Sequence, residues 1–255
     1  MNTVKEIYDK LCEFAPLDLQ LEFDNSGFLL GRFEAPAEKV LLSLDLTSEV
    51  AEEAIESGAG LVITHHPVIF DPMKSLTDCA PGKEKLLRLL ENTVAVISMH
   101  TNLDIAQGGV NDVLISLLGA ANEGVFDEEG CGRKGSFDKP MPLSAFLGIC
   151  KEKLNTNGLR YYDAGRAVEH IAVLGGSGGS NLIGAWKAGC DTFVTADIKY
   201  GVFLLARDLG INLIDGDHFC TENPVIPVLA EKLRAAFPET EFIVSDRHRQ
   251  TARFF

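Results

Sequence analysis

The chain has 255 residues, of which 46% are hydrophobic and 24% are charged, and its formal net charge is −14. This length admits one large domain or two modest ones, and either would bury a core. The acidic balance argues against nonspecific binding to nucleic acid or to an anionic membrane, because both depend on a basic surface. An anionic substrate would need a local basic pocket. The stretch 247–253 is one candidate for it, although a solvated tail or an oligomer contact is the simpler interpretation.

The N-terminal segment 1–14 predicts an amphipathic helix and lacks the apolar core of a secretion signal. No stretch approaches the roughly 18 apolar residues that a membrane span needs. The six cysteines are scattered without a C-x-x-C pair, which indicates reduced thiols and disfavours thiolate metal ligands. We therefore expect a cytoplasmic protein.

The first half of the chain alternates apolar strands with helices. Strands are predicted at 40–44, 60–64 and 93–98, and helices at 49–57 and 83–91. Thr47 or Ser48 caps the first of these helices, and Gly58 ends it. This order predicts parallel strand pairing through crossover helices.

After a connection at 124–142, rich in Gly and charged residues, the alternation of strands and helices repeats. Helices are predicted at 143–154, 182–188 and 201–209, and strands at 170–174, 192–195 and 211–214. A final helix at 227–236 and a strand at 241–245 close the chain. The sequence thus predicts an α/β protein with two similar lobes and mostly parallel sheets.

Three predicted strand ends are followed by metal-binding residue types. These are His65 and His66, then His100 with Asp104, and finally His218 with Glu222. Ligands of parallel α/β sheets bind beyond the carboxyl ends of the strands, so the three ends can converge on one crevice.

The spacing of these residues favours two metal ions over one. Adjacent side chains of an extended segment point apart, so His65 and His66 suit two neighbouring ions. His218 and Glu222 are four residues apart, on the same face of one helical turn. The two oxygens of Glu222 can bridge the ions, and Asp104 completes the set. Imidazole with carboxylate suits Zn, Fe, Mn or Co.

Each of these residues also has a purely structural interpretation. A lone histidine is more often a hydrogen-bonded structural residue, and we assign His170 and His248 that role. Asp104 alone fits a turn, and Glu222 alone fits a first-turn helix acid. Only their joint occurrence at three strand ends favours the metal site. Asp45 fits a cap and an orienting partner of a histidine equally well.

The glycine-rich run 175–180 has two interpretations as well. Its backbone N–H groups could cradle a phosphate, but it matches no complete phosphate-binding motif. A tight strand-to-helix turn is the better prediction.

Six motifs together resemble the YbgI or Nif-three-like family of dinuclear metal-centre proteins, whose bacterial members are catalogued as GTP cyclohydrolase 1 type 2 homologues. The resemblance covers essentially the whole chain. The motifs are Asp24-Asn25-Ser26-Gly27, Leu44-Asp45-Leu46-Thr47, Thr64-His65-His66-Pro67, His100-Thr101-Asn102-Leu103-Asp104 with Gly108-Gly109-Val110-Asn111-Asp112, Thr195-Ala196-Asp197-Ile198-Lys199-Tyr200, and His218-Phe219-Cys220-Thr221-Glu222.

The resemblance implies a ligand set and a domain organisation. Two divalent ions are expected per chain, one held by His65, Asp104 and Glu222, the other by His66, His218 and Glu222. It further implies two interlinked α/β lobes in a Nif-three-like fold, a metal-binding lobe at 1–125 plus 211–255 and a second lobe at 126–210. A ring-shaped homohexamer is also implied.

The chain departs from the family pattern at two positions. Ala196 stands where glycine is expected, and Gly201 where histidine is expected. The expected metal ligands are all present, so these departures bear on the reaction and leave the metal site intact.

The leading functional hypothesis is a metal-dependent hydrolase acting on a nucleotide or another purine-like heterocycle, as in the GTP cyclohydrolase reaction that opens the imidazole ring of guanine. His100 is the candidate proton shuttle, and Glu222 is the second candidate catalytic residue. Lys74 and Lys199 are candidates for contacting the triphosphate of GTP. The alternatives are a two-metal phosphoesterase and a non-catalytic metal-binding or regulatory scaffold.

Overall fold

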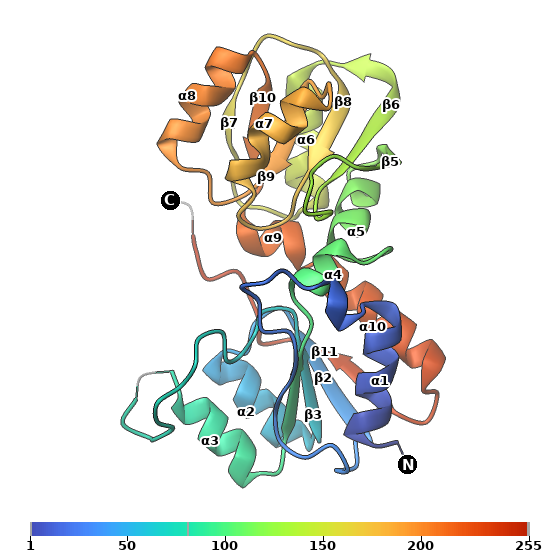
Figure 1. Ribbon diagram of the computed structural model, residues 1–255, viewed down its shortest axis with the longest axis vertical. Coiled ribbons are helices and arrows are strands. Elements are labelled where there is room, and N and C mark those ends of the chain that lie inside the picture. Colours follow the sequence, from blue (N-terminus) through green and yellow to red (C-terminus); the bar gives the residue numbers. More distant parts are fainter. Residues whose placement is uncertain (1, 81, 254–255) are drawn as a thin grey trace. The chain divides into compact units, whose positions relative to one another are not determined.

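The computed structural model describes residues 2–80 and 82–253. It divides into two compact units (Figure 1): unit 1 runs up to Ala106 and includes Ile226–Arg249, and unit 2 comprises Gln107–Val225 with the residues from Gln250 on. The second unit therefore interrupts the first in the sequence. These boundaries differ from the expected 126–210, because β5 (Ala121–Val125) and β10 (Asn212–Asp215) belong to the sheet of the second unit.

Unit 1 contains a five-stranded sheet in the order β1-β4-β3-β2-β11. The strands are β1 (Gly27–Leu30), β2 (Lys39–Ser43), β3 (Leu61–Thr64), β4 (Ala95–Ser98) and β11 (Glu241–Val244). All neighbours are parallel except β1, which runs antiparallel to β4. The central strands are continuous apolar runs because helices cover both faces of the sheet.

The helices of unit 1 lie on both sides of this sheet (Figure 1). Helices α2 (Ser48–Ser57) and α3 (Glu84–Glu91) lie on one side, and α1 (Val4–Phe14) and α10 (Val225–Ala236) on the other. A capping box between Thr3 and Glu6 starts α1. Thr47 caps α2, and Gly58 ends it in the left-handed conformation, as predicted.

Unit 2 contains a six-stranded mixed sheet in the order β5-β6-β8-β9-β10-β7. Only β8, β9 and β10 pair in parallel, so the prediction of mostly parallel sheets holds for unit 1 alone. The strands are β5 (Ala121–Val125), β6 (Arg133–Met141), β7 (Arg160–Tyr162), β8 (Val168–Val173), β9 (Thr192–Thr195) and β10 (Asn212–Asp215).

The segment predicted as a connection at 124–142 contains β6, which pairs with β5 and β8. Most of its residues are polar, so no apolar run marks it. The helices of unit 2 are α5 (Val110–Leu117), α6 (Leu143–Lys153), α7 (Leu182–Lys187), α8 (Tyr200–Leu209) and α9 (His218–Glu222).

The carboxyl ends of parallel strands position the candidate residues in each unit. In unit 1, β3 leads into His65 and His66, and β4 leads through Met99 into His100 and the short helix α4 (Thr101–Ile105). In unit 2, β10 leads into α9. No helix among the described residues is long and apolar enough to cross a membrane.

Candidate metal centre

Unit 1 brings three histidines together. The ligand atoms of His65, His66 and His100 all lie within 4.8 Å of one another. The rings of His65 and His66 are 4.9 Å apart between centroids, so the expected splaying to opposite sides is wrong. The backbone N–H groups of both residues donate to the carbonyl of Leu44, which curls the chain after β3.

The Nδ1 atoms of these three histidines are all held by oxygen acceptors. Nδ1 of His65 lies 2.8 Å from the carbonyl oxygen of Met99, which can only accept. Nδ1 of His66 and Nδ1 of His100 lie 2.7 Å from Asp45 and Asp24, respectively.

The carboxylates of Asp24 and Asp45 favour the same tautomer of the two histidines that they contact. Burial raises the pKa of Asp24, but hydrogen bonds from His100 and other donors outweigh it and hold the pKa well below its usual range. Burial acts in the same way on Asp45, where hydrogen bonds from His248 and His66 lower the pKa. Ionised carboxylates only accept, so Nδ1 carries the proton and the lone pair of the neutral ring is on Nε2. Metal-binding histidines typically show this arrangement.

Asp104 adds a carboxylate to unit 1. It lies on α4, where its N–H donates to the carbonyl of His100. Its Oδ1 lies 3.7 Å from Nε2 of the fully buried His65. Two ligands at ~2.1 Å from one tetrahedral ion lie about 3.4 Å apart, so this pair has a separation near that of two ligands of one ion.

Unit 2 contributes an imidazole and a carboxylate on α9. Nε2 of His218 lies 3.0 Å from Oε2 of Glu222, and the helical turn places them on one face as predicted. Nδ1 of His218 lies 2.8 Å from Asp197, which repeats the anchoring of unit 1. Asp217 caps α9 by accepting from the N–H of Cys220.

The glycine-rich run after β8 makes room for the Glu222 carboxylate. A Cβ at Gly176 would overlap Oε1 of Glu222 and come within 3.1 Å of Nε2 of His218. The N–H groups of Gly175, Gly176 and Gly178 donate to Asn111, Thr221 and Thr195, respectively. These donors are used within the chain, which favours the tight turn over a phosphate cradle.

The donor set fits a metal ion. Buried imidazole nitrogens with preset lone pairs and buried carboxylate oxygens are what Zn, Fe, Mn and Co prefer. Glu222 is 4% exposed and His65 is fully buried, so these polar groups need strong partners. The His and Glu side chains could therefore bind metal.

The remaining predicted residues are exposed or pack against other side chains. His170, Lys74 and Lys199 are exposed. Arg247, in the basic stretch, pairs with Glu56, which argues against a basic pocket for an anionic substrate there. His248 is buried against Asp45 as a structural residue, with Nε2 3.1 Å from Oδ2.

Sequence reasoning missed two anchors and left a third open. Asp24 and Asp197 appeared only as parts of family motifs, yet each holds a histidine. For Asp45 the sequence left open a helix cap and an orienting partner of a histidine. Asp45 contacts His66, and Thr47 caps the helix instead.

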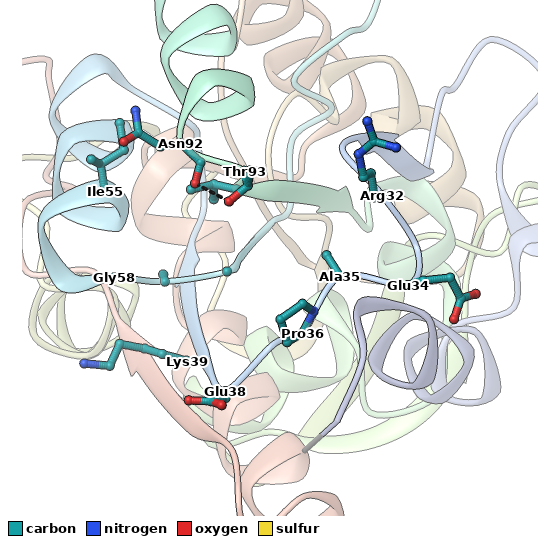
Figure 2. Close-up of a pocket in the computed structure, with 13 residues that line it drawn as sticks. Arg32, Glu34, Ala35, Pro36, Glu38, Lys39, Ile55, Gly58, Asn92 and Thr93 are labelled. Atoms are coloured by element: carbon teal, nitrogen blue, oxygen red, sulfur yellow. Dashed lines mark hydrogen bonds between the residues drawn. The ribbon is translucent and has the colours of Figure 1, made fainter.

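A separate hollow of about 680 Å³ lies at the amino ends of the parallel strands of unit 1, the edge opposite to the histidines. Figure 2 shows its lining, which includes Arg32, Glu38, Lys39 and Asn92 and contains no histidine or cysteine. It lacks the nitrogen and sulfur donors of a transition-metal site.

Comparison with known proteins gives consistent matches over nearly the whole chain. A family model described as Duf34/NIF3 (NGG1p interacting factor 3) matches residues 2–251. A Clostridium perfringens protein named GTP cyclohydrolase 1 type 2 homolog is 34% identical, over 98% of this chain and 99% of that protein. A Clostridium acetobutylicum protein of the same name is 33% identical, over 98% of each. The crystal structure of a hypothetical protein from Staphylococcus aureus superposes with a TM-score of 0.93 at 26% identity, over 99% of both chains.

Proposed function

Because this chain belongs to the Duf34/NIF3 family, we propose that it is a dinuclear metal-dependent hydrolase acting on a nucleotide or another purine-like heterocycle. The specific form of the proposal is hydrolytic opening of the imidazole ring of GTP. The names of the two clostridial relatives support this choice of substrate.

The proposed ligand set is the one the family resemblance implies. One ion is held by His65, Asp104 and Glu222, and the other by His66, His218 and Glu222. The separations of the donor atoms within each unit, 3.7 Å for His65 with Asp104 and 3.0 Å for His218 with Glu222, support these assignments. We propose Zn, Fe, Mn or Co as the metal.

One observation carries the proposal: four histidines are anchored through Nδ1 to an oxygen acceptor. Structural histidines rarely need a common tautomer, whereas metal ligands do, because the lone pair must be on the coordinating nitrogen. The anchors are Met99, Asp45, Asp24 and Asp197 for His65, His66, His100 and His218, respectively.

His100, Asp24 and Glu222 would each have a separate role in the reaction. Two bound divalent ions would supply activation of water and polarisation of the attacked atom. His100 accepts or gives a proton at Nε2, because Asp24 holds its Nδ1. The Asp24 carboxylate holds the His100 ring in place while that proton is carried. Glu222 would help to hold the ions.

The absence of a histidine side chain at Gly201 concerns contacts with the substrate and leaves the metal ligands unaffected. A Cβ at Gly201 would meet nothing within 4 Å, so the missing histidine side chain removes a group and leaves the packing unchanged. Ala196 is fully buried, and its N–H donates to the carbonyl of Gly176.

Metal-loaded protein and a substrate panel test the function. Protein loaded separately with Mn, Fe, Co and Zn is incubated with GTP and with phosphodiesters. Formate release from GTP is the expected result. Release of phosphate or nucleotide would instead identify a phosphoesterase, and no turnover of any substrate would identify a scaffold.

A variant pair tests the metal centre itself. The double variant His66→Ala Glu222→Ala should lose the copurifying metal and the activity. His170→Ala, which removes an exposed histidine, is the matched control and should retain both. Equal metal content in the two variants would refute the site.

The assembly and compartment are part of the proposal. We propose a cytoplasmic homohexamer, on the support of the family resemblance and of six scattered cysteines without a C-x-x-C pair. Light scattering on the purified protein should return the mass of six chains.

A further inference from the structure

Two phenylalanines lie exposed beside the histidines of unit 1. Phe23 is 64% exposed and Phe70 is 47% exposed, and their ring centroids are 6.4 Å apart. The ring of Phe70 also lies 6.2 Å from that of His100, at an interplanar angle of 83°. Phenylalanine is usually buried, and exposed apolar side chains that adjoin polar functional groups mark binding sites.

Hydrogen bonds tie the segments that carry both aromatic rings to His100. Phe23 directly precedes Asp24, whose carboxylate accepts from Nδ1 of His100. Phe70 directly follows Ile69, whose carbonyl accepts from the side chain of Asn25 at 2.5 Å. The turns that carry the two rings are therefore tied to each other and to the histidine. This is an arrangement that costs little entropy when a ligand binds.

We propose that Phe23 and Phe70 form an aromatic platform, on which the planar base of a purine nucleotide stacks with its reacting ring turned towards His100. The inference rests on the proposed function and names how that site selects its substrate class. Aromatic side chains attract other π-systems in stacked or edge-to-face arrangements, and every nucleobase presents a π-face. A platform without charged groups would select for the base and leave the phosphates to other side chains.

The test compares two ligands on metal-loaded protein. GTP carries the planar base, and inorganic triphosphate lacks it. Replacing both phenylalanines (Phe23→Ala Phe70→Ala) should raise the Kd of GTP about 5- to 150-fold, the range for loss of base stacking, and leave the Kd of triphosphate unchanged. As single variants, Phe70→Trp should keep the GTP affinity of the wild type, whereas Phe70→Leu should weaken it.

Leu90→Ala is the matched control, because Leu90 is also a large apolar side chain that is exposed, at 41%, and it lies on α3. It should leave both dissociation constants unchanged. Thermal unfolding of all variants checks that the fold is retained.

Three results would overturn the platform. They are an unchanged Kd of GTP in the double variant, an equal loss of triphosphate binding, and a change in oligomer mass, which would assign the rings to a contact between copies. Failure of the proposed function is distinguishable: wild-type protein that binds GTP through the rings but releases no formate refutes the hydrolase and supports the platform. Wild-type protein that does not bind GTP refutes the platform.

Discussion

Asp45 accepts a hydrogen bond from Nδ1 of His66 at 2.7 Å, and this contact orients the ring of a proposed metal ligand. Its second oxygen lies 3.1 Å from Nε2 of His248, so the carboxylate is held from both sides. Groups that orient a ligand histidine typically contribute about 10- to 100-fold to metal affinity.

Asp45→Ala should therefore weaken metal binding by about 10- to 100-fold, because His66 loses the acceptor that fixes its tautomer. Competition with a chelator measures the affinity. Asp9→Ala, which removes an exposed carboxylate on α1, is the control and should bind metal as the wild type does. An unchanged affinity in Asp45→Ala would show that the carboxylate serves only the packing of His248.

Gly176→Ala should abolish metal loading. Its Cβ would overlap the Glu222 carboxylate and displace it. Because Gly176 also has a positive φ of 64°, alanine adds backbone strain of about 1–2 kcal/mol.

Gly189→Ala separates the two effects. Gly189 has a φ of 84°, and a Cβ there would meet nothing within 4 Å. Both variants should lose a similar amount of backbone stability in urea unfolding, while only Gly176→Ala loses metal by elemental analysis. Full metal content in Gly176→Ala would exclude the clash.

The sequence predicted the elements that local signals define. Thr47 and Gly58 mark the ends of α2, and the apolar runs around 40–44, 60–64 and 93–98 correspond to buried parallel strands. β6 was missed because its residues are largely polar, and a strand with an exposed face shows no apolar run. β7 has only three residues at the edge of its sheet. Such strands depend on pairing with distant residues, which a local pattern cannot reveal.

The candidate donors followed from residue type and position, whereas their anchors did not. Asp24 is 76 residues from His100, and Asp197 is 21 residues from His218. Each contact exists only once the sheets have formed. The curl at His65 and His66 was likewise hidden, because it depends on the carbonyl of Leu44.

Removal of metal should lower the melting temperature. Metal that binds only the folded chain at about 100 times its Kd adds about 2.7 kcal/mol to the free energy of unfolding. Differential scanning fluorimetry of chelator-stripped protein, before and after metal is restored, measures the shift. Glu222→Gln should show no shift, since the amide is a poor replacement for the carboxylate. A stripped wild-type protein that melts at the same temperature with and without metal would contradict the centre.

The pair of Asp112 and Arg133 should make the fold sensitive to acid, independently of metal. Nε of Arg133 lies 2.5 Å from Oδ1 of Asp112, and the two side chains are only 6% and 16% exposed, respectively. Burial raises the pKa of Asp112, but hydrogen bonds from the N–H of Gly108 and from Arg133 outweigh it, so the pKa is lowered.

A carboxyl whose pKa is lower in the folded state stabilises the fold above its unfolded pKa of about 3.9. That stability is lost as the pH falls through the folded value. Wild-type protein should therefore lose more unfolding free energy between pH 6 and pH 3 than Asp112→Asn, which cannot titrate there. At pH 7 the variant should be less stable by about 3 kcal/mol, because Arg133 keeps a buried charge without its partner. Urea unfolding at each pH on metal-free protein measures both effects, and parallel pH profiles for the two proteins would rule out this pair as the source of acid sensitivity.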